Sequence, residues 1–210
     1  MNAQLNPSTE RVLRISIDLG ERLFVLMLFA TFVVRLSHTI ISRPYNLLVL
    51  LSEGLVVLLV LIRRTTANVS MRPLDWVVAL AGTALPLLLR AGGSPPLPTA
   101  IGTVLMFGGL SFAIWAKACL RRSFGLAAAN RGAVEGGPYR WVRHPMYAGY
   151  IFVYIGFSLN NPLTRNLAIF AAIVALLVLR ILAEERVLRT DSDYGRYRSI
   201  VGYRLIPGLF

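Results

Sequence analysis

The chain has 210 residues, of which 56% are hydrophobic and only 15% are charged. A soluble domain carries about 25% charged residues, so the composition excludes an ordinary soluble protein and indicates one that lies in a membrane. The formal net charge of +12 does not indicate a nucleic-acid partner, because the basic residues gather at the ends of apolar segments. The single cysteine, Cys119, excludes an internal disulfide framework and a multi-cysteine metal site.

Apolar segments follow one another along the chain, over residues 23–36, 44–62, 74–89, 98–119, 146–160 and 166–183. Several of them approach the ~18–20 residues that a helix needs to cross the hydrocarbon core of a bilayer. Helices satisfy all of their own backbone hydrogen bonds in lipid, whereas open strands do not. We therefore predict an all-α, polytopic membrane helical bundle with about six spans (five to six).

The first 22 residues form a polar arm, and we expect the first helix to begin after it. The arm lacks the early apolar region of a cleaved signal peptide, so we expect no such peptide. In the second segment, Pro44 suits the first turn of a helix. Glu53 lies near the middle of that helix, where we expect it to pair with His38 or Arg35; the alternative is that it contacts a substrate.

Proline and glycine shape the third and fourth segments. Pro86 is predicted to kink the third helix or to mark its outer end. The stretch "RAGGSPPLP" (90–98) predicts a short outer connection. In the fourth helix, Gly102, Gly108 and Gly109 are small enough to let neighbouring helices approach closely.

The basic residues also predict an orientation. If Met1 is cytoplasmic and the chain spans six times, most of the 22 lysines and arginines fall on the inner side, and the outer connections hold only Arg35, Arg43, Arg90 and Arg165. Cytoplasmic segments of membrane proteins carry this excess of positive charge. We expect an integral protein of the cell inner membrane or the endoplasmic reticulum, with both termini on the cytoplasmic side.

The longest interior segment without a span covers residues 120–145, and a loop of this length in so small a protein is usually functional. The two helices that follow it form a C-terminal hairpin. The hairpin brings His144 and Pro145 to the same membrane face as Arg180 and Glu185, about forty residues later. We expect the remaining C-terminal segment to fold back over this face as a cytoplasmic cap.

Arg180 follows the unbroken apolar run "LAIFAAIVALLVL" and shares a helix face with Glu184, four residues on. A charge at that depth indicates a functional site by default. The alternative is an arginine that reaches up to the lipid headgroups, with Glu184 as its surface partner.

His144 precedes Pro145, which favours an extended backbone at the histidine and a helix that begins at the proline. The amino end of a helix suits an anion, and the acidic pair across the hairpin suits an amine. One zwitterionic ligand with a carboxylate and an amine would satisfy both ends. The alternative is a capping or interfacial histidine. We expect no metal site, because one histidine and two adjacent glutamates on a helix do not converge as ligands.

These residues form a pattern. The chain reads "GPYRWVRHPMYAG" from residue 137, Glu184 and Glu185 about forty residues later, and then "RLIPG". Over residues 105–210 it resembles the isoprenylcysteine carboxyl methyltransferase family, which is related to the membrane phospholipid methyltransferases. The resemblance implies an S-adenosylmethionine-dependent integral membrane methyltransferase. It also implies one integral unit, with N-terminal transmembrane helices over 1–100 and the catalytic core over 101–210.

The resemblance also implies roles for individual residues, assigned by their position in the shared motif. The resemblance implies a cytoplasm-facing pocket for S-adenosylmethionine that is lined by Tyr139, Arg143, His144, Pro145, Met146, Tyr147 and Glu184, and by Arg131, Gly132, Ala133 and Val134 from the preceding loop. It places Arg180 beside the acceptor, with Glu184 and Glu185 as further catalytic or substrate-binding residues. Tyr194 and Tyr197 would act as lid residues.

We expect a lipophilic or lipid-anchored acceptor, such as the carboxylate of an isoprenylcysteine-like molecule. The acceptor would enter from the bilayer past the glycines of the fourth helix, and membrane lipids would surround the protein. Two other classes stay open. A membrane sterol-type reductase would bind NADPH in place of S-adenosylmethionine. A small transporter or non-catalytic membrane protein would need neither, but the chain shows no inverted repeat.

Overall fold

The computed structural model describes residues 7–37, 46–64, 66, 69–90, 92–208 and 210. Within these residues the chain forms the α-helices α1 (Pro7–Ser37), α2 (Asn46–Ile62), α3 (Pro73–Ala84), α4 (Thr99–Leu120), α5 (Pro145–Asn160), α6 (Thr164–Leu188) and α7 (Ser192–Ile200). The extended contact in the described chain is one isolated bridge between Val69 and Ala129. The predicted all-α fold is therefore confirmed.

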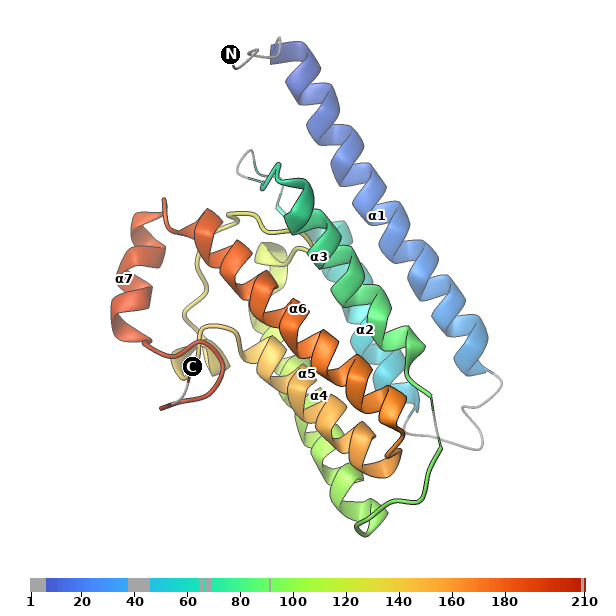
Figure 1. Cartoon of the computed structure of the whole chain (residues 1–210). Coiled ribbons are helices and arrows are strands. Elements are labelled where there is room, and N and C mark those ends of the chain that lie inside the picture. Colours follow the sequence, from blue (N-terminus) through green and yellow to red (C-terminus); the bar gives the residue numbers. More distant parts are fainter. Residues whose placement is uncertain (1–6, 38–45, 65, 67–68, 91, 209) are drawn as a thin grey trace.

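Helices α1 to α6 match the six apolar segments, and five of them gather into a bundle while α1 lies along one side of it (Figure 1). In the described part of the chain, two helical segments are long and apolar enough to cross a membrane, Thr99–Ser123 and Thr164–Leu188. Helix α3 has only 12 residues and α5 only 16. The membrane character holds, whereas the number of spans stays a prediction.

Helix α1 begins at Pro7, so the expected break between a polar arm and the first helix is wrong. The helix runs on because its acidic side chains find basic partners. Asp18 pairs with Arg22 one turn on, at 2.7 Å, and both Asp18 and Glu21 bind Arg63 at the end of α2. Because these charges are paired, this part of the chain can stay helical and pack against α2.

Helices α4 and α5 run antiparallel in close contact, and glycines make this possible. A Cβ atom added to Gly109 would lie 2.6 Å from the carbonyl oxygen of Gly149, and Gly102 likewise faces Gly156. Gly108 is different, since in the described structure its position faces no atom within 4 Å. The prediction is thus correct for Gly102 and Gly109 and wrong for Gly108. Gly102 and Gly109 are closed off by α5, whereas the predicted role of this helix as a doorway for the acceptor stays a prediction.

The end of the bundle where α5 meets α6, which is the predicted outer end, is fastened by one buried amide. Helix α3 gives way to a 3-10 turn (Leu85–Leu88) around Pro86, as predicted. Beyond it, Asn166 of α6 donates to the carbonyl of Arg90 at 2.8 Å and to that of Asn161 at 2.9 Å.

The predicted roles of Pro44, His38, Arg35 and Glu53 fall on residues or side chains outside those that the structure describes.

The C-terminal segment returns to the start of α5. Asp191 caps α7 by accepting from the backbone N–H of Asp193 and Tyr194. Further on, the backbone carbonyls of Tyr203 and Arg204 accept from the N–H of Arg143 and His144, both at 2.9 Å. The segment is thus held against the predicted hairpin end. Its action as a cap over a bound cofactor stays a prediction.

Candidate active site

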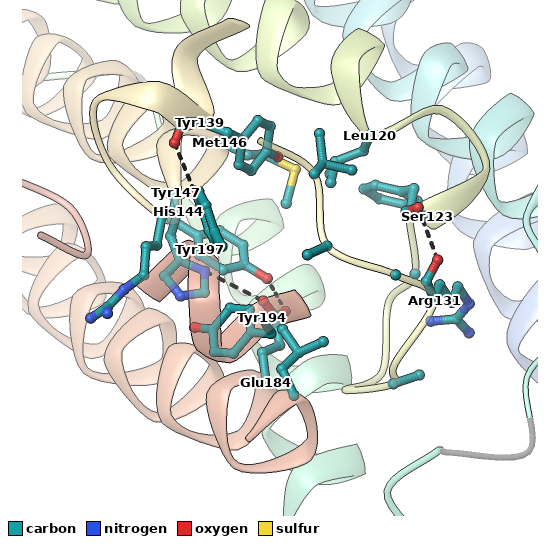
Figure 2. Close-up of a pocket in the computed structure, with 18 of the residues that line it drawn as sticks. Leu120, Ser123, Arg131, Tyr139, His144, Met146, Tyr147, Glu184, Tyr194 and Tyr197 are labelled. Atoms are coloured by element: carbon teal, nitrogen blue, oxygen red, sulfur yellow. Dashed lines mark hydrogen bonds and ion pairs between the residues drawn. The ribbon is translucent and has the colours of Figure 1, made fainter. Parts of the chain in front are cut away.

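A hollow of about 770 Å³, open mouth included, lies where α5 begins and α6 ends. Four parts of the chain enclose it: the loop after α4, the first turn of α5, the end of α6, and α7 (Figure 2). The sequence prediction that loop 120–145 meets the end of α6 is therefore confirmed in geometry.

Glu184 is the acidic group of this hollow. Its side chain is 21% exposed and accepts a hydrogen bond from the hydroxyl of Tyr147. Nδ1 of His144 lies 3.6 Å from one carboxylate oxygen (Figure 2). The Nε atom of Arg180 lies 3.4 Å from the other. The predicted hairpin thus brings together residues from both of its ends around one accessible carboxylate.

Glu185, the next residue, lies behind the wall of the hollow, with a side chain that is only 2% exposed. Arg204 donates to it from two nitrogens at 3.0 and 3.1 Å. Nε of Arg143 and Nε2 of His144 lie 3.1 and 3.4 Å from its other oxygen. These contacts tie α6 to the start of α5 and to the C-terminal segment. The predicted part of Glu185 in catalysis stays untested.

His144 lies between the two glutamates, one at each ring nitrogen. Burial by itself lowers the pKa of the imidazole, but hydrogen bonding to Glu184 and Glu185 and their negative charges raise the pKa above its usual 6.5. The backbone carbonyl of His144 accepts from the N–H of Tyr147 and Ala148 at 3.1 and 3.2 Å. Since these N–H groups of the first turn are in use, an anion at this end would bind side chains such as Arg143 and His144.

Arg180 is buried, so the alternative in which it reaches up to the headgroups is wrong. Its Nη2 donates to the backbone carbonyl of Leu126 at 2.6 Å, and its guanidinium lies over the ring of Tyr147, 5.4 Å from the centroid. The side chain borders the hollow only through Glu184 and Tyr147, since Arg180 is not among the residues that line it.

The opposite wall is the loop that contains Arg131, Gly132, Ala133 and Val134, all of which line the hollow. Arg131 is buried, and burial lowers the pKa of its guanidinium. Its Nε donates to the carbonyl of Arg64 at 3.1 Å, so this side chain is bonded to the α2–α3 connection. Gly132 has a φ of 93°, which glycine adopts without strain.

Two tyrosines of α7 close the hollow on the side of the C-terminal segment. Tyr197 donates from its hydroxyl to the backbone carbonyl of Tyr139 at 2.7 Å. The buried hydroxyl of Tyr194 makes no hydrogen bond to any described residue. Burial raises the pKa of both α7 tyrosines and of Tyr139, so all three are neutral donors at neutral pH.

The hollow includes most of the predicted cofactor residues and some that were not predicted. Of the predicted set, only Pro145, Arg180 and Glu185 do not line it. The additional lining residues are mainly small or apolar: Leu120, Ser123, Phe124, Gly125, Ala127, Ala129 and Leu188. The signal for them in the sequence was the low polarity of loop 120–130, which is unusual for a loop exposed to water. Among the described residues, no cluster of His, Cys, Asp and Glu could hold a metal ion.

Comparison with known proteins supports the family resemblance. Residues 97–195 match the model of the phospholipid methyltransferase family. This segment belongs to that family. The matched residues contain the first turn of α5, the glutamates of α6 and Tyr194, and the resemblance seen in the sequence is confirmed.

The fold has a solved counterpart. The chain is similar to the structure of a eukaryotic intramembrane Ras methyltransferase, isoprenylcysteine carboxyl methyltransferase, with a TM-score of 0.54 and 17% sequence identity. The similarity covers 98% of this chain and 88% of that one. A comparison with curated proteins gave no match. The chain thus has a membrane-methyltransferase fold, and neither a reductase nor a transporter family is favoured.

Proposed function

We propose that this protein is an S-adenosylmethionine-dependent integral membrane methyltransferase that acts on a lipophilic acceptor. The observation that carries the proposal is the hollow around Glu184, in which an accessible carboxylate, a buried histidine and several tyrosines meet within a methyltransferase family segment. We place the cofactor in this hollow.

The lining fits that cofactor in its chemistry. Glu184 is accessible and suits the amine of the methionine moiety, while Arg143 and His144 suit its carboxylate. The hydroxyl of Tyr194, buried and without a partner among the described residues, adds a hydrogen-bond donor. The apolar side chains of Phe124 and Leu188, which line the hollow, suit an adenine ring.

S-adenosylmethionine, when bound, supplies an electrophilic methyl group that an acceptor displaces in line. Such a transfer requires mainly alignment and exclusion of water, which the C-terminal segment and the buried tyrosines provide. Arg180, held by Leu126 and Glu184, lies one turn before the carboxylate on α6, next to the apolar run of that helix, and would orient the acceptor.

The ion pairs also bear on the chemistry of the acceptor. An amine acceptor needs a base to remove its proton, whereas a carboxylate acceptor needs none. Both glutamates are engaged, Glu184 with Tyr147, Arg180 and His144, and Glu185 with Arg204. We therefore favour a carboxylate acceptor of the isoprenylcysteine type over a lipid amine.

The test is ligand-dependent thermal stability of the full chain in detergent. S-adenosylhomocysteine at about 100 times its Kd should raise the Tm by roughly 5–10 °C, whereas NADPH should leave it unchanged. Glu184→Gln should reduce this shift. Glu135→Gln is the matched control, because Glu135 is exposed, pairs with Arg196 and lies outside the hollow. Stabilisation by NADPH in place of S-adenosylhomocysteine would contradict the proposal and indicate a reductase.

A further inference from the structure

The peptide unit of Leu126 is held from both sides in the wall of the hollow. Its N–H donates to Oε1 of Glu21 on α1 at 2.9 Å, and its carbonyl accepts from Nη2 of Arg180 on α6 at 2.6 Å. The side chain of Leu126 is buried, and its neighbours Gly125 and Ala127 line the hollow. The position of this wall therefore depends on a residue 105 positions earlier in the chain.

Glu21 is held in turn by Arg63. The two side chains are only 2% and 1% exposed and form an ion pair, and Arg63 also binds Asp18. A charge buried this deeply is costly to leave unpaired, so Glu21 and Arg63 fix each other in place. The pair presents one carboxylate oxygen of Glu21 to the N–H of Leu126.

The α2–α3 connection runs alongside the same wall. The N–H of Arg64 donates to the carbonyl of Arg122 at 2.8 Å, and that of Ser70 donates to Ala128 at 2.9 Å. Arg131, which lines the hollow, donates back to Arg64. The wall and the end of α4 are thus attached to the N-terminal part of the chain through Arg122, Leu126, Ala128 and Arg131, and the attachment at Leu126 uses the buried carboxylate of Glu21.

We propose that Glu21 and Arg63 are positioning residues of the cofactor pocket, which act through the Leu126 peptide to hold the wall over residues 124–131 against Arg180. The proposal rests on the proposed function for the identity of the ligand. It assigns to helices α1 and α2, which lie outside the matched segment 97–195, a direct part in shaping the site.

Loss of Glu21 has a defined consequence at Arg180. Without its acceptor, the buried N–H of Leu126 is unsatisfied, and the wall must move to reach water or another partner. The carbonyl of Leu126 moves with it, which leaves Glu184 as the remaining hydrogen-bond acceptor of Arg180. The positions of the wall and of the Glu184 side chain therefore change together, because Arg180 contacts both.

The first test needs no ligand. Backbone hydrogen–deuterium exchange of the full chain in detergent should show faster exchange over residues 124–131 in Glu21→Leu than in wild type. Glu21→Gln keeps an oxygen acceptor for the N–H of Leu126, while Asp18 still pairs with Arg63, so this variant should exchange more slowly over 124–131 than Glu21→Leu. Asn166→Leu is the matched control, because Asn166 is also a buried polar residue that fastens a loop, but at the outer end of the bundle.

The second test measures the affinity for S-adenosylhomocysteine. Glu21→Leu should weaken binding by about tenfold, the effect of one lost buried hydrogen bond. Asn166→Leu should weaken binding by less than about threefold even if it lowers the Tm as much. If Glu21→Leu does not fold, Arg63→Lys replaces it, because lysine cannot hold Asp18 and Glu21 together with one planar group.

Unchanged exchange over 124–131 in the Glu21 variant, or equal losses of affinity in the Glu21 and Asn166 variants, would overturn the proposal. Faster exchange confined to this wall, together with a selective loss of affinity, supports it. A wild-type protein that does not bind S-adenosylhomocysteine would refute the proposed function. The exchange experiment would still decide whether Glu21 positions the wall.

Discussion

At the scale of single residues, the site depends on one imidazole between two carboxylates. Glu184 and Glu185 are consecutive on α6 and point in different directions, yet His144 contacts one through each ring nitrogen, at 3.6 and 3.4 Å. Glu184 thus stays open to the hollow while Glu185 binds Arg204. His144 thus lies between a glutamate that borders the hollow and one that holds the C-terminal segment.

This arrangement makes stability depend on pH in a defined direction. The pKa of His144 is raised above 6.5 in the folded protein by the two glutamates, despite its burial. The resulting stabilisation is fully present below the unfolded pKa of about 6.5 and is lost as pH rises through the folded pKa. Tm should therefore exceed that of His144→Gln most at acidic pH, with a difference that shrinks as pH rises. A pH-independent difference would contradict the charged pair.

At the scale of helices, the contact between α4 and α5 supports the start of α5, where the motif lies. Backbone groups meet directly at this contact, because Gly109 and Gly149 have no side chains to separate them. Small residues allow such close approach within membranes. The position of His144 relative to the end of α4 therefore depends on glycines that have no functional group of their own.

Two adjacent glycines provide a matched test of this contact. Gly109→Ala places a methyl group 2.6 Å from the carbonyl oxygen of Gly149, which should destabilise the protein by about 1–3 kcal/mol. Gly108→Ala faces open space on the same helix and should leave stability nearly unchanged. Thermal unfolding of both variants in one detergent gives the comparison. Equal losses of Tm in the two variants would contradict the role of this contact, because the lower backbone freedom of alanine in the unfolded chain by itself raises stability.

Helices were the part of the fold that sequence could predict, since long apolar runs and the proline at 145 mark them clearly. The expected C-terminal hairpin also brings His144 close to Glu184, at 3.6 Å. Sequence did not separate Gly108 from Gly109, because a lipid-facing and a helix-facing glycine belong to the same apolar run. It also gave no sign that Glu21 would reach Leu126, because a loop without periodicity does not indicate its hydrogen-bond partners.

At the scale of the whole molecule, charge and pocket lie at the same end of the bundle. The ends of α2, α4 and α6, with Arg63, Arg122 and Arg186, meet the loop that lines the hollow. The opposite end, beyond Asn166, carries few basic residues. This asymmetry agrees with the positive-inside rule and predicts that the hollow faces the cytoplasm, where a water-soluble cofactor would be available.

Cysteine labelling tests this orientation directly. In a Cys119→Ser background, Ser94→Cys adds one thiol to the connection before α4, and Asp193→Cys adds one to α7; both positions are exposed. A membrane-impermeant maleimide added to intact cells should label the thiol at 94 at once, because this connection faces outward. It should label the thiol at 193 only after the membrane is permeabilised, because α7 lies over the hollow on the cytoplasmic side. The reverse pattern would place the hollow outside the cell, away from cytoplasmic S-adenosylmethionine, and would contradict both the orientation and the proposed function.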